Sequence, residues 1–106
     1  MIKEEEMERA LRWMATTDTE LADWRVAVLR TEYLAAVAES LSYKLMEGTV
    51  EDRKRACKAA PEVQTAMENH FATVRGYEKL RAQRKSAELL IETWRSVNAN
   101  QRKGNI

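Results

Sequence analysis

The sequence predicts an all-α protein whose main feature is a long antiparallel hairpin of two helices. Only 3 of its 106 residues are glycine and 1 is proline, so long stretches run without a helix breaker. Apolar residues recur at helical spacing over two of these stretches. Charged residues make up 33% of the chain and hydrophobic residues 44%, which is typical of a globular protein. A chain of this length accommodates one domain, so we predict a single helical domain over residues 1–106.

The first predicted element is a short amphipathic N-terminal helix over residues 1–15. Four glutamates lie in its first turns, where the positive end of the helix dipole favours them. The cluster Thr16-Thr17-Asp18-Thr19 consists of residue types that cap helix N-termini, so we expect the next helix to start there. The apolar positions of the first helix are Met7, Ala10, Leu11 and Met14.

A long helix over residues 18–47 and a short connecting helix over residues 50–58 follow. The long helix contains neither glycine nor proline, and Gly48 stands where a helix C-terminus commonly has a glycine. Thr49 is a suitable N-cap for the short helix. The apolar stripe of the long helix comprises Leu21, Trp24, Val28, Thr31, Ala35, Ala38 and Leu45, and Leu34, Val37 and Leu41 widen it.

The second long helix is predicted over residues 61–99. Pro61 suits its first position, and Gly76 in its middle is tolerated at about 1 kcal/mol relative to alanine. Residues 100–106 lack periodicity and are expected to fray. The inner stripe comprises Val63, Met67, His70, Val74, Tyr77, Leu80, Arg84, Ala87, Ile91 and Trp94.

The apolar stripes of both long helices are too wide for two helices to cover. Three tryptophans add large surfaces that need partners. We therefore predict a homodimer or larger oligomer that completes a bundle of four or more helices. The residues predicted at the oligomer interface are Trp13, Trp24, Trp94 and Ile91.

No residue pattern in the sequence predicts an enzyme. Cys57 and His70 are the only residues of their kinds, whereas a zinc site needs several such ligands at short spacing. We interpret both as structural residues. Pairs such as Glu88 and Glu92 arise at random on helix surfaces, and no Gly-rich phosphate loop or nucleophile elbow occurs. We expect no catalytic residue, no metal, no cofactor and no small-molecule substrate.

A basic segment over residues 75–85 is the strongest candidate for a binding surface. It contains five cations and one acid, with Tyr77 among them, a composition suited to phosphates and bases. The alternative is internal pairing, because an antiparallel hairpin places residues 81–85 near Glu20 and Asp23.

Charge is unevenly distributed along the chain, although the net charge is only +1. Residues 1–53 carry 7 Lys/Arg against 12 Asp/Glu, and residues 54–106 carry 11 against 5. These opposite halves predict either internal antiparallel pairing or a basic face for an acidic partner. Arg84 lies on the inner stripe, and replacing this costly buried cation by leucine is expected to raise stability. The residues predicted to contact nucleic acid or another partner are Arg75, Lys79, Arg81, Arg84, Lys85, Arg95 and Arg102.

Four segments of the sequence resemble a group of small, uncharacterised helical bacteriophage proteins. The likeness extends from about Thr16 to the C-terminus and lies in helix boundaries and helix faces. The genes of that group are often found near recombination or single-strand-annealing genes. The resemblance therefore implies an accessory role in phage DNA metabolism and carries over no catalytic residue. The segments are Glu47-Gly-Thr-Val-Glu-Asp-Arg-Lys, Pro61-Glu-Val-Gln, Leu80-Arg-Ala-Gln-Arg-Lys-Ser-Ala-Glu and Trp94-Arg-Ser-Val-Asn-Ala-Asn-Gln-Arg.

These observations predict a non-enzymatic, oligomeric phage or prophage module in the cytoplasm of a bacterial host. It would assist recombination or replication by binding DNA or a recombination protein. The alternatives are a phage inhibitor of a host nuclease or defence complex, and a purely structural self-assembling protein. A single cysteine fits a reducing compartment, and no run of about 18 apolar residues predicts a membrane span.

Overall fold

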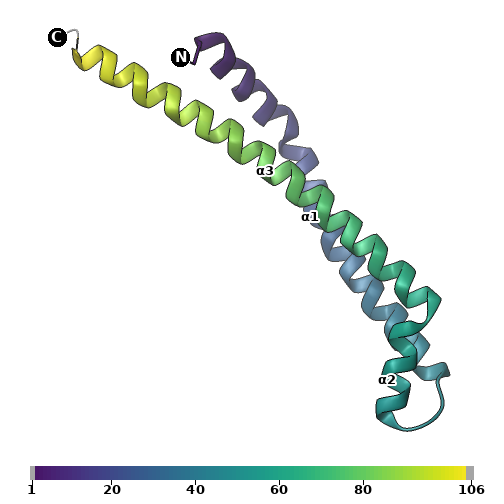
Figure 1. Cartoon of the computed structure of the whole chain (residues 1–106). Coiled ribbons are helices and arrows are strands. Elements are labelled where there is room, and N and C mark those ends of the chain that lie inside the picture. Colours follow the sequence, from purple (N-terminus) through teal and green to yellow (C-terminus); the bar gives the residue numbers. More distant parts are fainter. Residues whose placement is uncertain (1, 105–106) are drawn as a thin grey trace. The chain divides into compact units, whose positions relative to one another are not determined.

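The computed structural model describes residues 2–104, and this part of the chain contains three helices and no strand. The helices are α1 (Glu4–Leu45), α2 (Val50–Ala59) and α3 (Pro61–Gly104) (Figure 1). The predicted all-α helical hairpin with a short connecting helix is confirmed. Within the described range, no helix combines the length and the apolar character needed to cross a membrane.

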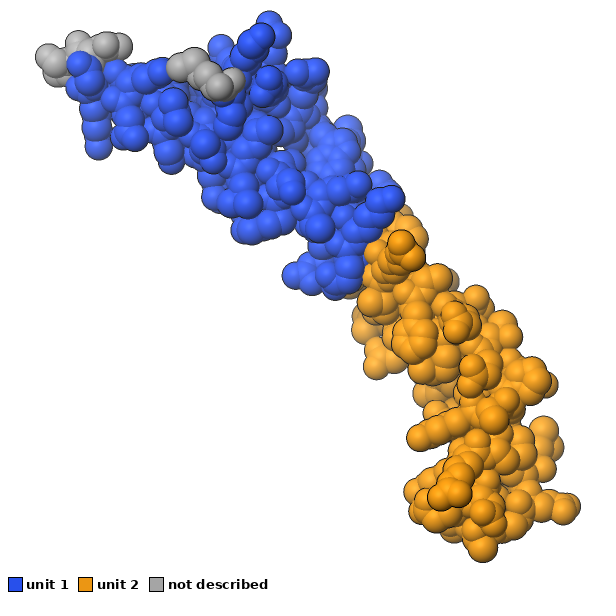
Figure 2. All heavy atoms as spheres, viewed as in Figure 1, with its two compact units in different colours: residues 1–22, 78–106 blue, residues 23–77 orange. Residues whose placement is uncertain are grey.

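The chain divides into two compact units (Figure 2). Unit 1 consists of Met1–Ala22 and Glu78–Ile106, so it pairs the first part of α1 with the last part of α3. Unit 2 consists of Asp23–Tyr77 and contains the rest of both helices together with α2. Each unit therefore has its own set of contacts between segments that lie far apart in the sequence.

The predicted break between a helix over residues 1–15 and another over residues 18–47 is wrong, because α1 runs through this point without interruption. The threonine side chains do not cap a new helix. The hydroxyls of Thr16 and Thr17 each donate to the carbonyl oxygen of Trp13, one turn earlier, at 2.9 Å. A hydroxyl satisfied in this way is compatible with a helix interior, so these residues do not end the helix.

The connection between α1 and α2 uses the predicted cap residues. Gly48 has a φ of 110°, a conformation that residues with a Cβ rarely adopt. Thr49 caps α2, since its Oγ1 accepts a hydrogen bond from the backbone N–H of Asp52 at 3.2 Å. α1 ends at Leu45, two residues before the predicted end.

The last helix is longer than predicted. Ala60 has an extended backbone, and its N–H donates to the carbonyl oxygen of Cys57 at 3.1 Å, which ends α2 directly before Pro61. Residues 100–104 were expected to fray but continue α3 to Gly104. Residues 105–106 of the predicted tail lie outside the described residues.

The core of unit 2 lies where α2 meets the two long helices. Cys57, Ala60 and Val63 are buried, and Cys57 is only 1% exposed. The Cys57 thiol donates to the carbonyl oxygen of Glu39 at 2.9 Å, which supports the structural role predicted for it. The partly buried residues packed against this core are Ala38, Tyr43, Met46 and Met67.

Two cross-helix contacts hold α1 and α3 antiparallel within unit 2. A Cβ atom on Gly76 would overlap the Trp24 ring at Cη2, so the indole packs directly against the glycine. Thr31 Oγ1 lies 3.1 Å from the carbonyl oxygen of Val28 and 2.9 Å from Nδ1 of His70. With the hydroxyl proton donated to the carbonyl, Thr31 accepts the Nδ1 proton of His70. This contact supports the structural role predicted for His70.

Candidate interaction surfaces

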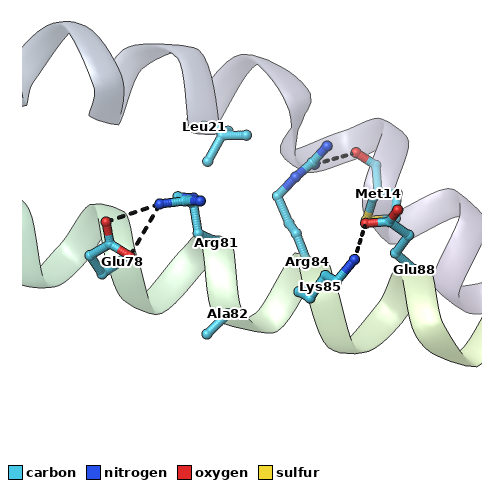
Figure 3. Close-up of a pocket in the computed structure, with 8 residues that line it drawn as sticks. All are labelled: Met14, Leu21, Glu78, Arg81, Ala82, Arg84, Lys85 and Glu88. Carbon is cyan, nitrogen blue, oxygen red and sulfur yellow. Dashed lines mark hydrogen bonds and ion pairs between the residues drawn. The ribbon is translucent and has the colours of Figure 1, made fainter.

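Arg84 joins α3 to α1 in unit 1 through three hydrogen bonds. Figure 3 shows the one to Met14. Its Nη1 donates to the carbonyl oxygen of Met14 at 2.8 Å and to Oγ1 of Thr17 at 2.6 Å. Its Nη2 donates to Oδ1 of Asp18 at 2.6 Å. Only 14% of the Arg84 side chain is exposed. We call Arg84, Met14, Thr17 and Asp18 the Arg84 cluster, and its donors are directed at the chain's own atoms.

The acid that pairs with Arg84 differs from those expected. Glu20 and Asp23 were the predicted acids, whereas Asp18 is the residue in contact. The Thr17 hydroxyl donates to the carbonyl oxygen of Trp13, so its lone pairs remain available for Arg84. Thr17 and Asp18, which were predicted to cap a helix, therefore accept hydrogen bonds from the Arg84 guanidinium instead. The internal-pairing interpretation of the basic segment holds for this residue.

Two further predicted contact residues lie in local ion pairs beside a groove in unit 1. Arg81 Nη1 is 3.2 Å from Glu78 Oε1, and Lys85 Nζ is 3.7 Å from Glu88 Oε2 (Figure 3). Both pairs join residues one turn apart on α3 and are largely exposed, so each contributes little to stability. The groove has a volume of about 530 Å³. Its lining is of mixed charge, with Met14, Leu21 and Ala82 as the apolar part.

The remaining predicted contact residues do not gather on one face. Lys79 and Arg81 are two residues apart, which places them about 200° apart around the axis of α3. Arg95 and Arg102 are exposed and seven residues apart, so these two share a face of α3. Arg75 belongs to unit 2. The structure therefore brings together Arg95 with Arg102, and Arg81 with Lys85, but not all seven.

The charge asymmetry of the sequence becomes an internal complementarity in unit 1. Residues 2–22 carry six Asp/Glu against three Lys/Arg, and residues 78–104 carry seven Lys/Arg against three Asp/Glu. These two segments form the unit together, so an acidic helix segment lies in the same unit as a basic one. Opposite charges on paired helices favour that pairing. The ion pair between Arg84 and Asp18 joins the two segments directly.

The predicted interface residues lie in three different environments. Ile91 is 6% exposed and belongs to the interior of its own chain. Trp24 packs on Gly76. Trp13 lines a groove of about 600 Å³ together with Ala10, Ala87 and Leu90, and Trp94 lines one of about 290 Å³. Only Trp13 and Trp94 therefore border grooves that a partner could enter.

The largest exposed apolar residues of α1 within unit 2 lie elsewhere. Val26 is 54% exposed, Leu29 is 61% exposed and Tyr33 is 68% exposed. Leu34, Leu41 and Leu45 were predicted on the inner stripe, but they are 51%, 57% and 83% exposed. We call these six residues the exposed apolar face of α1. The sequence carried a signal for it, because residues 26–45 contain only four charged residues and are apolar on all sides.

Within residues 2–104, no group of three or more His, Cys, Asp or Glu side chains is arranged to hold a metal ion. Comparison of the chain with protein-family models, with curated proteins and with solved structures found no match.

Proposed function

We propose that the chain is a non-enzymatic helical interaction module that works as an oligomer. In this proposal it assists DNA recombination or replication in a bacteriophage or prophage by binding a recombination protein or DNA. The observation that carries the oligomeric part of this proposal is the exposed apolar face of α1, whose six large side chains are all half exposed or more. Large apolar side chains exposed together in this way are typical of a surface that another chain covers.

A protein partner is better supported than DNA as the first contact. Nucleic-acid binding starts from cations that are available to neutralise phosphates. Arg84 donates its hydrogen bonds to α1, and Arg81 and Lys85 lie beside glutamates. Arg95 and Arg102 are exposed on one face of α3 and remain the best candidates for a DNA contact.

The recombination context rests on the resemblance of the sequence to phage proteins encoded near annealing genes. A reconstituted strand-annealing reaction tests it directly. We expect the purified chain to bind a phage single-strand-annealing protein and to change the rate at which that protein anneals complementary strands. Absence of binding both to that protein and to single- or double-stranded DNA at low salt would contradict the proposal.

A further inference from the structure

The part of the exposed apolar face around Val26 and Tyr33 points away from the helix that α1 already contacts. Ala35 and Ser42 are buried, and each lies nine residues after an exposed member of the face, Val26 and Tyr33 respectively. Nine residues correspond to about 180° around a helix. α1 therefore buries one side within unit 2 and presents a second apolar side to solvent.

The composition of this face suits close helix packing. Ala36 and Ser40 are exposed and lie at i+3 and i+7 from Tyr33. Small side chains between large ones let another helix approach and receive its side chains in the gaps. Arg30 and Lys44 are the cations on the same side of the helix. The occupant is thus a helix of mainly apolar character that tolerates a positive charge.

The total surface of the chain exceeds that of a compact protein by more than an interface with a second copy would bury. The chain exposes 8176 Å², whereas a compact protein of 12.3 kDa exposes about 6,100 Å². The difference of about 2,000 Å² exceeds the roughly 800 Å² that each partner contributes to a standard interface. A single shared interface between two copies is therefore large enough to cover the face.

We propose that the first part of the exposed apolar face of α1, which comprises Val26, Leu29, Tyr33 and Leu34, packs against the same part of a second copy, with the two α1 helices antiparallel. A parallel pair would place Arg30 against Arg30 of the other copy and Lys44 against its counterpart. Like charges opposite one another disfavour that arrangement. An antiparallel pair centred between Thr31 and Glu32 instead places Arg30 beside Tyr33 of the other copy, where a guanidinium interacts favourably with an aromatic ring.

The same centre sets Val26 opposite Val37 of the second copy. Two identical surfaces then meet about a two-fold axis, which is the most common symmetry of soluble homodimers. This inference deepens the self-association that the proposed function requires. It involves neither DNA nor a recombination protein, so its test and the annealing test can fail independently.

Sedimentation equilibrium of the full chain tests the interface. The unsubstituted protein is expected to dimerise with a Kd of about 10 μM or lower, as interfaces of this size commonly do. The double substitution Leu29→Glu/Tyr33→Glu is expected to weaken dimerisation at least about tenfold while the helix content measured by circular dichroism is retained. Phe71→Glu on α3 is the matched control, because Phe71 is 55% exposed and lies outside the face.

A protein that remains monomeric at the highest attainable concentration would overturn the proposal. A dimer that survives Leu29→Glu/Tyr33→Glu, or that Phe71→Glu disrupts equally, would do the same. If the double glutamate variant loses its helix content, Tyr33→Ser replaces it as the test, since Tyr33 is 68% exposed and its removal leaves no cavity.

Disulfide formation tests the antiparallel register. Val26→Cys and Val37→Cys are prepared as separate proteins and oxidised alone and as a mixture. We expect at least about fivefold more disulfide-linked dimer in the mixture than in either sample alone, because a disulfide requires Cα atoms within about 7 Å. Cys57 is 1% exposed, and the unsubstituted protein controls for its reactivity. As much disulfide-linked dimer from either variant alone as from the mixture, or no crosslinking in any sample, would overturn the register.

Discussion

Unit 1 and unit 2 join the same two helices by different means. In unit 1 the Arg84 cluster supplies directional hydrogen bonds from α3 to α1, and the apolar residues Met7, Leu80 and Ile91 of the same unit are buried. In unit 2 the contact is mainly apolar, with Trp24 against Gly76 and α2 closing a core around Cys57, and the Thr31–His70 contact adds a polar connection.

This difference follows from the charge and side-chain size of each segment. Unit 1 combines an acidic and a basic helix segment, so a partly buried arginine finds acceptors there. Unit 2 contains the stretch over residues 26–45, whose apolar side chains lie on all sides of the helix and cannot all be covered by one neighbouring helix. The connection between α1 and α3 is therefore polar and directional in unit 1 and mainly apolar in unit 2.

The largest expected effect separates the interior of unit 1 from an oligomer interface. Ile91→Ala removes a side chain that is 6% exposed and is expected to lower the free energy of unfolding by about 2 to 4 kcal/mol. Urea unfolding followed by circular dichroism measures the change. Because Ile91 is buried within its own chain, the loss should not vary with protein concentration. A loss that depends on protein concentration would indicate that Ile91 lies at an oligomer interface. Leu89→Ala is the control, because Leu89 is 49% exposed.

The next effect tests the polar connection in unit 1. The sequence alone predicts that Arg84→Leu raises stability, but the structure reverses that expectation because Met14, Thr17 and Asp18 would all lose a donor. The free energy of unfolding is expected to fall by about 2 to 3 kcal/mol. Lys79→Leu alters an exposed lysine of the same helix and should change it by less than about 0.5 kcal/mol. Equal effects of the two substitutions would argue against a special role for the Arg84 cluster.

A smaller effect is expected at the close contact of unit 2. Gly76→Ala gains about 1 kcal/mol of helix propensity but places a Cβ where the Trp24 ring lies, so a net loss of about 1 to 2 kcal/mol should result. In a Trp24→Leu background the same substitution should become neutral or stabilising. Thermal unfolding of the four proteins of this double-mutant cycle gives the coupling. Additive effects would mean that the indole readily moves aside.

The smallest effect concerns DNA. If α3 of unit 1 contacts phosphates, Arg95→Gln/Arg102→Gln should weaken binding of a single-stranded oligonucleotide about fivefold at low salt. The slope of log K against log salt should fall by about 2, one for each phosphate contact removed. Fluorescence anisotropy measures both quantities. Arg25→Gln/Arg55→Gln removes two exposed arginines of unit 2 and serves as the control, and an equal response to it would indicate nonspecific attraction only.

Local chemistry explains where prediction from the sequence succeeded. Thr49 and Pro61 determine the ends of α2 and α3 through a hydrogen bond and a fixed φ, and both effects act within a few residues. The wrong prediction of a helix start at Thr16 to Thr19 also came from local chemistry. Their side chains suit a cap in isolation, but a hydroxyl can equally bond one turn back inside a continuous helix.

The candidate surfaces were predictable only in part. A basic segment on α3 is visible in the sequence, yet the partner of each cation depends on which residue lies opposite on α1. Asp18 rather than Glu20 meets Arg84 because the relative placement of the helices is decided by packing over many residues. Val26, Leu29 and Tyr33 were overlooked because a helix that is apolar all round gives no periodic signal to show which side faces inward.

The sequence by itself determined that this protein is helical, where its short connecting helix lies, and which stripe of α3 is turned inward, since propensity, caps and periodicity act over short distances. Only the tertiary structure decided that α1 is one helix, that Gly76 receives an indole ring, and that Arg84 is held by α1. The last two outcomes depend on atoms brought together from positions more than fifty residues apart, and nothing in either segment alone specifies its neighbour.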